Sequence, residues 1–296
     1  MCTLGQIDNL YIKYTSELEN IKIDKNASIY HYTSTQGLQG IITNKELWFS
    51  NIKYLNDEQE LLYAEKLTQS IAKEFLKKNK NSIFLDLILN NKIIPTIKLP
   101  IDYVYSQEKI EQNGQIGYKL PLSLIQYMQN KFSKNLKFVA CFSEAKDNLP
   151  LWNYYSKCEN KNGYNIEFNK EKLLNNLSKL TKNYIHGRVI YEKTKQQQIL
   201  TNLISDFMQI YDSLSKDDEH EKGECLNAYW EILDICSMFF KNEAFCSEQE
   251  YRIIVNMNNL EKPYKCKDFR IINGIFIPYT KFKFNKNTIN SVTISP

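Results

Sequence analysis

The chain has few of the residues that build metal sites and phosphate-binding turns. Its 296 residues include nine glycines, seven prolines and three histidines, at positions 31, 186 and 220. The seven cysteines form no CxxC pair, so histidines and cysteines together do not complete a zinc signature. Neither a GxGxxG stretch nor a P-loop GK[ST] occurs, which argues against doubly wound dinucleotide folds and P-loop enzymes. We expect no metal.

Other absences concern cellular location and partners. No run of 18 or more apolar residues occurs, so no membrane span is predicted. The N-terminus lacks a basic segment followed by an apolar one, and the odd number of cysteines indicates reduced thiols, so we expect a cytoplasmic protein. The net charge of +4 is too small to indicate nucleic-acid binding by itself. No GxSxG elbow is present, which disfavours a serine or cysteine hydrolase.

The order of apolar patterns predicts a single α+β domain over residues 1–296, with a mixed or antiparallel split-sheet core and helical insertions. We expect an N-terminal helix in 1–27, an irregular insertion or small hairpin in 80–120, and a helical hairpin in 194–242. The core strands should lie in one unit of two packed sheets or a split sheet, with a cleft between them. The predicted core strands are 28–33, 46–50, 137–143, 163–168, 250–256 and 271–277.

Polar residues stand in strand-like surroundings at four places. They occur in "IYHYTS", "LWFSNIKYLND", "ACFSEAKDNLPLWNYYS" and "AFCSEQEYRIIV". Buried polar groups cost free energy unless they are paired, so these stretches form either internal networks or a functional cleft.

Two of the stretches hold candidate catalytic residues, each with a structural alternative. His31 is either a packed strand residue or the first member of a site. Glu248 and Glu250 share a face if their segment is extended, and two close carboxylates would raise one pKa. Alternatively, one of them pairs with Arg252 or Lys241.

The third stretch raises a similar choice. Trp152 is either a core aromatic or a residue that stacks on a ligand ring. The residues expected to frame the same cleft from the other side, or else only to cap helices, are Asn56, Asp57, Ser143, Glu144, Asp147 and Trp152.

Read together, these stretches resemble a bacterial family, domain of unknown function 2971. The likeness is carried by "IYHYTSTQGLQGIITNKELWFSNIKYLNDEQEL", "FVACFSEAKDNLPLWNYYS…GYNIEF" and "KNEAFCSEQEYRIIV", and it runs from about residue 28 to about residue 280. The family name implies no activity.

A second, looser resemblance does imply an activity. An early strand with His, a second strand ending in "LWFS" and a late strand with ExE are similar to ADP-ribosyltransferases of the His–Tyr–Glu type. This resemblance implies that His31 holds the ribose of NAD, that Glu250 stabilises the positive charge that develops as nicotinamide leaves, and that Glu248 orients the acceptor. Ser50 stands where that type has an aromatic residue, so stacking on nicotinamide falls to Tyr54, Trp48 or Trp152.

The resemblance therefore gives a set of candidate site residues. The catalytic candidates are Glu250, His31 and Glu248. The candidates for binding NAD as a substrate are His31, Tyr32, Thr33, Ser50, Tyr54, Ser143 and Trp152.

The leading hypothesis is an NAD-dependent ADP-ribosyltransferase-like enzyme, a toxin or antiphage defence effector that modifies protein or nucleic acid. An NAD glycohydrolase would use the same site with water as acceptor. A non-catalytic nucleotide- or nucleic-acid-binding module is an alternative from another class. A nuclease is a further alternative, although no ligand spacing favours it.

Overall fold

A computed structural model describes most of the chain. The described residues are 2–19, 27–52, 58–89, 109–112, 115–118, 137–156, 162–215, 219–257, 268–272 and 275–296. The strands are β1 (Ser28–Thr33), β2 (Glu46–Asn51), β3 (Lys109–Gln112), β4 (Gln115–Tyr118), β5 (Lys137–Ser143), β6 (Tyr164–Asn169), β7 (Tyr184–Arg188), β8 (Glu250–Asn256), β9 (Asp268–Ile272), β10 (Ile275–Lys283) and β11 (Ile289–Ile294).

Helices account for most of the remaining described residues. The α-helices are α1 (Cys2–Glu19), α2 (Thr35–Asn44), α3 (Glu58–Lys78), α4 (Ile83–Leu89), α7 (Leu149–Ser156), α8 (Lys170–Leu180), α9 (Lys193–Ser213) and α10 (Glu219–Ser237). Two 3-10 helices are also present, η3 (Glu243–Glu248) and η4 (Lys286–Thr288). Among the described helices, none is both long enough and apolar enough to cross a membrane.

Nine of the strands form one curled sheet around β5. The order along the sheet is β11-β6-β1-β5-β2-β10-β9, and β8 pairs with β5 and then with β7. All the described strand pairs within named strands are antiparallel. The prediction of an α+β protein with an antiparallel sheet is confirmed. The strands predicted at 28–33, 46–50 and 137–143 all belong to this sheet.

A short helix connects the first two strands. Ser34 caps α2 by accepting a hydrogen bond from the backbone N–H of Gly37, at 3.2 Å. At the other end Lys45 takes the left-handed conformation, with φ 53°, and its N–H bonds to the carbonyl of Ile41. These caps stop the helix after three turns, and β2 then begins at once.

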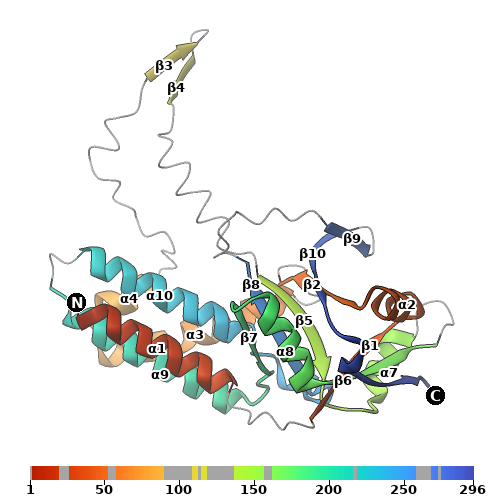
Figure 1. Ribbon diagram of the computed structural model, residues 1–296. Coiled ribbons are helices and arrows are strands. Elements are labelled where there is room, and N and C mark those ends of the chain that lie inside the picture. The colour runs from red at the N-terminus through yellow and green to blue at the C-terminus, as the bar shows by residue number, and fades with distance from the viewer. Residues whose placement is uncertain are drawn as a thin grey trace.

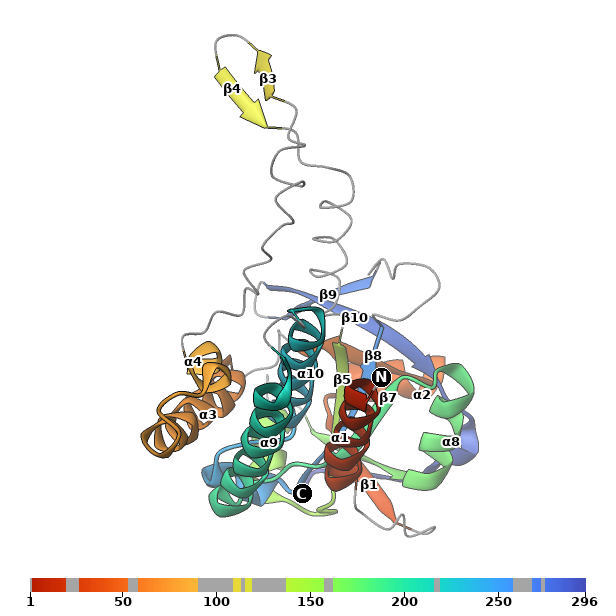
Figure 2. The ribbon, with the colours of Figure 1, turned by 90° about the vertical axis from the view of Figure 1, so that its left-hand side faces the viewer.

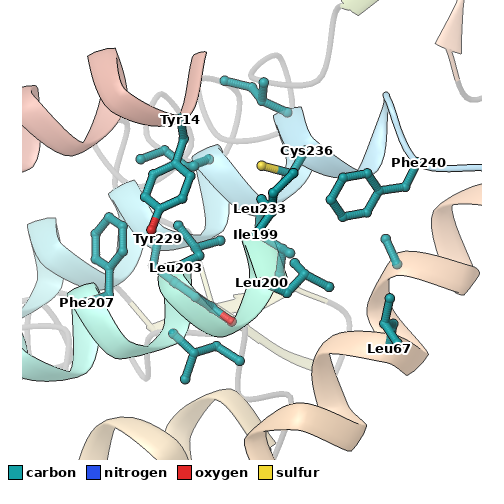
Figure 3. Packing of buried hydrophobic residues seen from close by; sticks show 14 of the residues in the cluster. Tyr14, Leu67, Ile199, Leu200, Leu203, Phe207, Tyr229, Leu233, Cys236 and Phe240 are labelled. Atoms are coloured by element: carbon teal, nitrogen blue, oxygen red, sulfur yellow. The ribbon is translucent and has the colours of Figure 1, made fainter. Parts of the chain in front are cut away.

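Five helices, α1, α3, α4, α9 and α10, gather on one side of the molecule, and most of the sheet lies on the other (Figure 1). Figure 2 shows this helical layer facing the viewer. Its core contains fully buried side chains from three helices, including Tyr14, Leu203, Phe207 and Tyr229 (Figure 3). Val139 and Ile254 of the sheet belong to the same cluster, so the helices cover one face of β5 and β8.

A second apolar cluster lies on the opposite face of these strands. Phe142 of β5 and Tyr251 of β8 belong to it, together with Leu173 and Leu177 of α8 and Ile41 of α2. Because side chains alternate along a strand, residues of odd number in β5 and of even number in β8 face the helical layer. This alternation decides on which side each candidate residue lies.

The structure differs from the sequence prediction at the end of the sheet, and it includes the hairpin expected in the insertion. Residues 271–277, predicted as one strand, belong to two strands, because Ile272 pairs with Ile275 in a β9–β10 hairpin. The Asn-Gly dipeptide between them is the strongest short-range hairpin signal, and the prediction overlooked it. The insertion predicted in 80–120 includes a helix, α4, and a β3–β4 hairpin, and its other residues lie outside the described part of the chain.

Candidate functional site

The sheet branches at β5. On one edge of β5, β1 pairs at Ser143 through Tyr30, while β2 pairs at Val139 and Phe138 through Ser50 and Asn51. In the described pairing neither strand reaches residues 140–142 of β5. The opposite edge pairs with β8 along its full length. The branch is therefore the place where β1, carrying His31, and β2, carrying Ser50, approach the same strand.

His31 fills this branch point. Its Nδ1 lies 3.1 Å from the carbonyl oxygen of Cys141, and its ring packs on Phe142 with a centroid distance of 5.6 Å. Burial lowers the pKa of His31 below its usual 6.5, the bond to Cys141 opposes this, and the charge of Arg270 lowers the pKa further. The ring is therefore neutral at pH 7.

The tautomer of this ring follows from its partner. A carbonyl oxygen can only accept, so Nδ1 carries the proton and donates it to Cys141. The other ring nitrogen, Nε2, is then a hydrogen-bond acceptor. An acceptor of this kind suits a hydroxyl group of a sugar and does not suit a phosphate.

Ser50 lies on the other side of the branch. It is only 6% exposed, pairs with Val139 and with Tyr279 of β10, and accepts a hydrogen bond of 2.6 Å from Nη2 of Arg270. Arg270 could not be selected from the sequence, because its place beside Ser50 depends on the β9–β10 hairpin. Ser50 pairs with Val139 and Tyr30 pairs with Ser143, so the backbones that carry Ser50 and His31 meet β5 four residues, about 13 Å, apart.

Glu250 lies at the start of β8, within a buried network of charges. Arg252 holds its carboxylate at both oxygens, with Nε–Oε1 and Nη2–Oε2 distances of 2.9 Å, and Nζ of Lys241 lies 3.3 Å from Oε2. Burial alone would raise the pKa of Glu250, but Arg252, Lys241 and the Cys141 thiol favour the charged form and lower the pKa to about 2. The pairing with Arg252 and Lys241 that the sequence offered as an alternative is present.

Two neighbours fix this network in place. Tyr191 accepts a hydrogen bond of 3.0 Å from the backbone N–H of Glu250. Gln196, fully buried, donates to the carbonyls of Ile190 and Lys241, and its Oε1 accepts from Tyr63. Gln196 thereby ties α9 to the segment that presents Lys241.

Glu248 and Ser143 hold the turn that precedes β8. The Glu248 carboxylate contacts Lys241 at 2.7 Å, and its backbone carbonyl accepts a hydrogen bond of 2.6 Å from the Ser143 hydroxyl. The same hydroxyl accepts from the backbone N–H of Ala145. Gln249 between the two glutamates is left-handed, with φ 44°, a conformation that non-glycine residues rarely adopt. The hydroxyl of Ser143 is thus engaged in holding the protein chain.

Tyr32 and Trp152 pack against each other away from the branch. Tyr32 is 4% exposed and its hydroxyl donates to the carbonyls of Ala145 and Lys146, while the Trp152 ring meets it edge-on at 4.8 Å. Trp152 also donates to Asp147. Thr33 is buried as well. These contacts give Tyr32 and Trp152 a packing role between β1 and α7.

Among the candidate aromatic residues that the structure describes, Trp48 lies open. It is 39% exposed, stacks on Tyr279 at 4.2 Å, and lies two residues before Ser50, on the same face of β2. Tyr54, Asn56 and Asp57, also predicted near the site, lie outside the described residues.

The structure brings His31, Ser50 and Glu250 to one short stretch of β5. Ser143 pairs with Tyr30 on one side and with Glu250 on the other, so two strand spacings, about 10 Å, separate the backbones of β1 and β8. The side chains diverge, however. His31 packs on the Phe142 side of the sheet, while Glu250 faces the helical layer. Cys141 joins them, since its carbonyl accepts from His31 and its thiol helps to lower the pKa of Glu250.

Comparison with known proteins gives one match. The model of a family described as a protein of unknown function (DUF2971) matches residues 151–253. This stretch includes α7, β6, α8, β7, α9, α10, η3 and the start of β8, and it supports the predicted likeness to that family over this part of the chain. No curated protein and no solved structure matches.

Proposed function

We propose that this chain is an NAD-consuming enzyme of the ADP-ribosyltransferase-like kind that binds its substrate at the branch of the sheet. One observation carries the proposal: three strands distant in sequence bring His31, Ser50 and Glu250 to residues 139–143 of β5. Three separate stretches that suggested a site are thus joined by the fold.

The residues suit distinct parts of NAD. Neutral His31 offers Nε2 as an acceptor for a ribose hydroxyl. Trp48 offers an exposed ring on which a base or nicotinamide stacks. Glu250 lies on the face of the sheet that Ser50 shares, opposite to His31; with a pKa of about 2 it stays ionised, and it would supply the negative charge that stabilises a cationic ribose as nicotinamide leaves. The acceptor would be a protein, a nucleic acid or, in the glycohydrolase version, water.

The test is incubation of the full chain with NAD, followed by chromatographic measurement of free nicotinamide. We expect release by the wild-type protein and a loss of roughly 100- to 1000-fold in the Glu250→Gln variant. Glu167→Gln is the matched control, since that carboxylate lies on β6 and accepts hydrogen bonds from Ser28 and Ser291. Equal release by Glu250→Gln and wild type, with both folded, would remove Glu250 from the site.

A second candidate function is a non-catalytic nucleotide-binding module. The observation that favours it is the neutralisation of Glu250 by Arg252 and Lys241, on the face of the sheet opposite His31. Binding of NAD without release of nicotinamide, weakened by His31→Gln and unaffected by Glu250→Gln, would select this candidate over the enzyme.

A further inference from the structure

Four exposed lysines gather where α8, the end of α2 and the 3-10 helix η4 meet. This lysine patch consists of Lys45, Lys172, Lys179 and Lys286, and all four residues are exposed. Among the described residues, none of the four forms an ion pair with a carboxylate. The described part of the chain therefore leaves these cations to the solvent.

Backbone and side-chain contacts bring the four lysines to one surface. The backbone N–H of Phe284 donates to the carbonyl of Lys45 at 2.9 Å, so the segment that leads into η4 runs beside the end of α2. On the other side of η4, Nζ of Lys172 donates to the carbonyl of Asn287 at 3.3 Å. Lys179 follows seven residues after Lys172, on the same face of α8 and about 10 Å further along its axis. The patch is thus continuous from α2 through η4 to α8.

The carboxylates next to these lysines in the sequence point elsewhere. Glu46, beside Lys45, accepts a hydrogen bond of 3.0 Å from Nε1 of Trp48. Both residues lie on the face of β2 turned away from α8, because the residue between them joins the apolar cluster that α8 covers. Glu171 precedes Lys172, which puts it about 100° around the axis of α8. Neither carboxylate neutralises the patch directly.

The arrangement of these charges suits a repeating anion better than a single small one. The cavity between α8 and β2 is lined mainly by apolar side chains, such as Leu47 and Leu177, so it does not offer a small anion a pocket of donors. A row of exposed cations is instead complementary to a row of phosphates, because each contact releases a counterion and the small gains add up. Asn285 and Asn287, both exposed, add amide groups of the kind that bond to phosphate and sugar oxygens.

The aromatic residues beside the patch narrow the ligand further. Phe282 and Phe284 are only 9% and 5% exposed. Proteins that bind single-stranded nucleic acid stack the bases on exposed aromatic rings, which these two side chains cannot supply. Contacts to the backbone of a duplex need no stacking, so the patch fits double-stranded nucleic acid.

We propose that Lys45, Lys172, Lys179 and Lys286 form a surface that binds the phosphate backbone of double-stranded nucleic acid without reading its sequence. This inference goes beyond the proposed function and does not depend on it. Lys45 lies five residues from Ser50 along the chain, or about 17 Å in an extended strand, so the patch is separate from the branch of the sheet.

The experiment is a fluorescence anisotropy titration of the full chain against labelled duplex DNA and duplex RNA of roughly 20 base pairs, about two helical turns. We expect the wild-type protein to bind these duplexes. The logarithm of its association constant should fall with the logarithm of the salt concentration with a slope of about −4, as for four phosphate contacts. Lys172→Gln combined with Lys286→Gln should weaken binding at every salt concentration and change the slope to about −2.

Lys73→Gln combined with Lys78→Gln is the matched control, because it removes the same charge from two exposed positions of α3 in the helical layer. This control should keep the wild-type affinity and slope. Equal weakening by the two double variants would show a general positive field and overturn the patch. Unchanged binding in the Lys172→Gln, Lys286→Gln variant overturns it too, as does a wild-type protein that binds neither duplex.

Two further probes separate a duplex backbone from other polyanions. A single strand of the same length should bind more weakly than the duplex, because its charge density is lower. Tighter binding of the single strand would show stacking on bases and overturn the assignment to a duplex. Vesicles of phosphatidylcholine and phosphatidylserine should not compete with the duplexes. Vesicle binding that depends on Lys172 and Lys286, without duplex binding, would assign the patch to a membrane surface instead.

Discussion

The buried charge network around Glu250 predicts a large effect on stability. The Glu250 side chain is 9% exposed, and the two cations that contact it, Arg252 and Lys241, are 3% and 11% exposed. Glu250→Gln keeps the size of the side chain but removes the negative charge that Arg252 contacts at both carboxylate oxygens. Removing one member of a buried ion pair costs about 3–5 kcal/mol. For a protein of this size that corresponds to a fall in Tm on the order of 10 °C.

The same network predicts how stability depends on pH. The pKa of Glu250 falls from the usual 4.5 to about 2 on folding, a difference worth roughly 3 kcal/mol. Because the folded pKa is the lower one, this contribution is complete above about pH 5 and is lost as the pH falls towards 2. At pH 3, less than about half of this contribution to the unfolding free energy remains. The gap in unfolding free energy between wild type and Glu250→Gln should narrow accordingly.

Urea unfolding followed by circular dichroism at several pH values from 3 to 7 measures both effects. Glu248→Gln is the control: it is two residues away, 27% exposed, and contacts only Lys241 among the described ion pairs. A pair of this exposure contributes about 0–1 kcal/mol. The reasoning is refuted if the two variants lose the same stability, or if the gap for Glu250→Gln is the same at pH 3 and pH 7.

Two further predictions concern packing. Gly187→Ala should lower the unfolding free energy by about 1–3 kcal/mol, because the new Cβ would lie 2.5 Å from the backbone oxygen of Leu18. Gly40→Ala, which has open space around it in helix α2, should instead raise the unfolding free energy by up to about 1 kcal/mol. Thermal melts in which Gly40→Ala is the less stable variant would contradict this. Leu203→Ala should lower the unfolding free energy by about 2–5 kcal/mol, since Leu203 is fully buried in the helical layer. Ile12→Ala, at a position that is 63% exposed, should change the unfolding free energy little. Equal urea midpoints for the two variants would contradict this prediction.

The sequence predicted the central strands well because their signals are local. The run "LKFVACFS" is almost continuously apolar, as expected of a strand buried on both faces, and β5 is covered by apolar clusters on both. "IYHYTS" and "EYRIIV" were predicted for the same reason. The sequence predicted only that these strands share one core; their pairing with β5 and its registers come from the structure.

The side on which each candidate lies could have been predicted in part. The spacing of two between Glu250 and Arg252 puts both on one face of an extended strand, so their ion pair follows from alternation. Lys241 could not be assigned in this way, because its approach depends on the turn between α10 and β8 and on Gln196 from α9. Arg270 required the order of β2, β10 and β9 in the sheet, which is set by long-range pairing and not by local pattern.

The candidate site has two halves, one around His31 and one around Glu250. The two halves can be perturbed separately, because they contact different atoms of β5. His31 is held by a backbone carbonyl of Cys141, which every substitution at that position retains, whereas Glu250 is contacted by the Cys141 thiol, which a substitution removes. A change of side chain at Cys141 therefore acts on the Glu250 half and leaves the tautomer of His31 as it is. A ligand that contacts both halves would couple them. The coupling between His31 and Glu250 variants, measured against binding and nicotinamide release, thus reports whether one nucleotide spans both sides of β5.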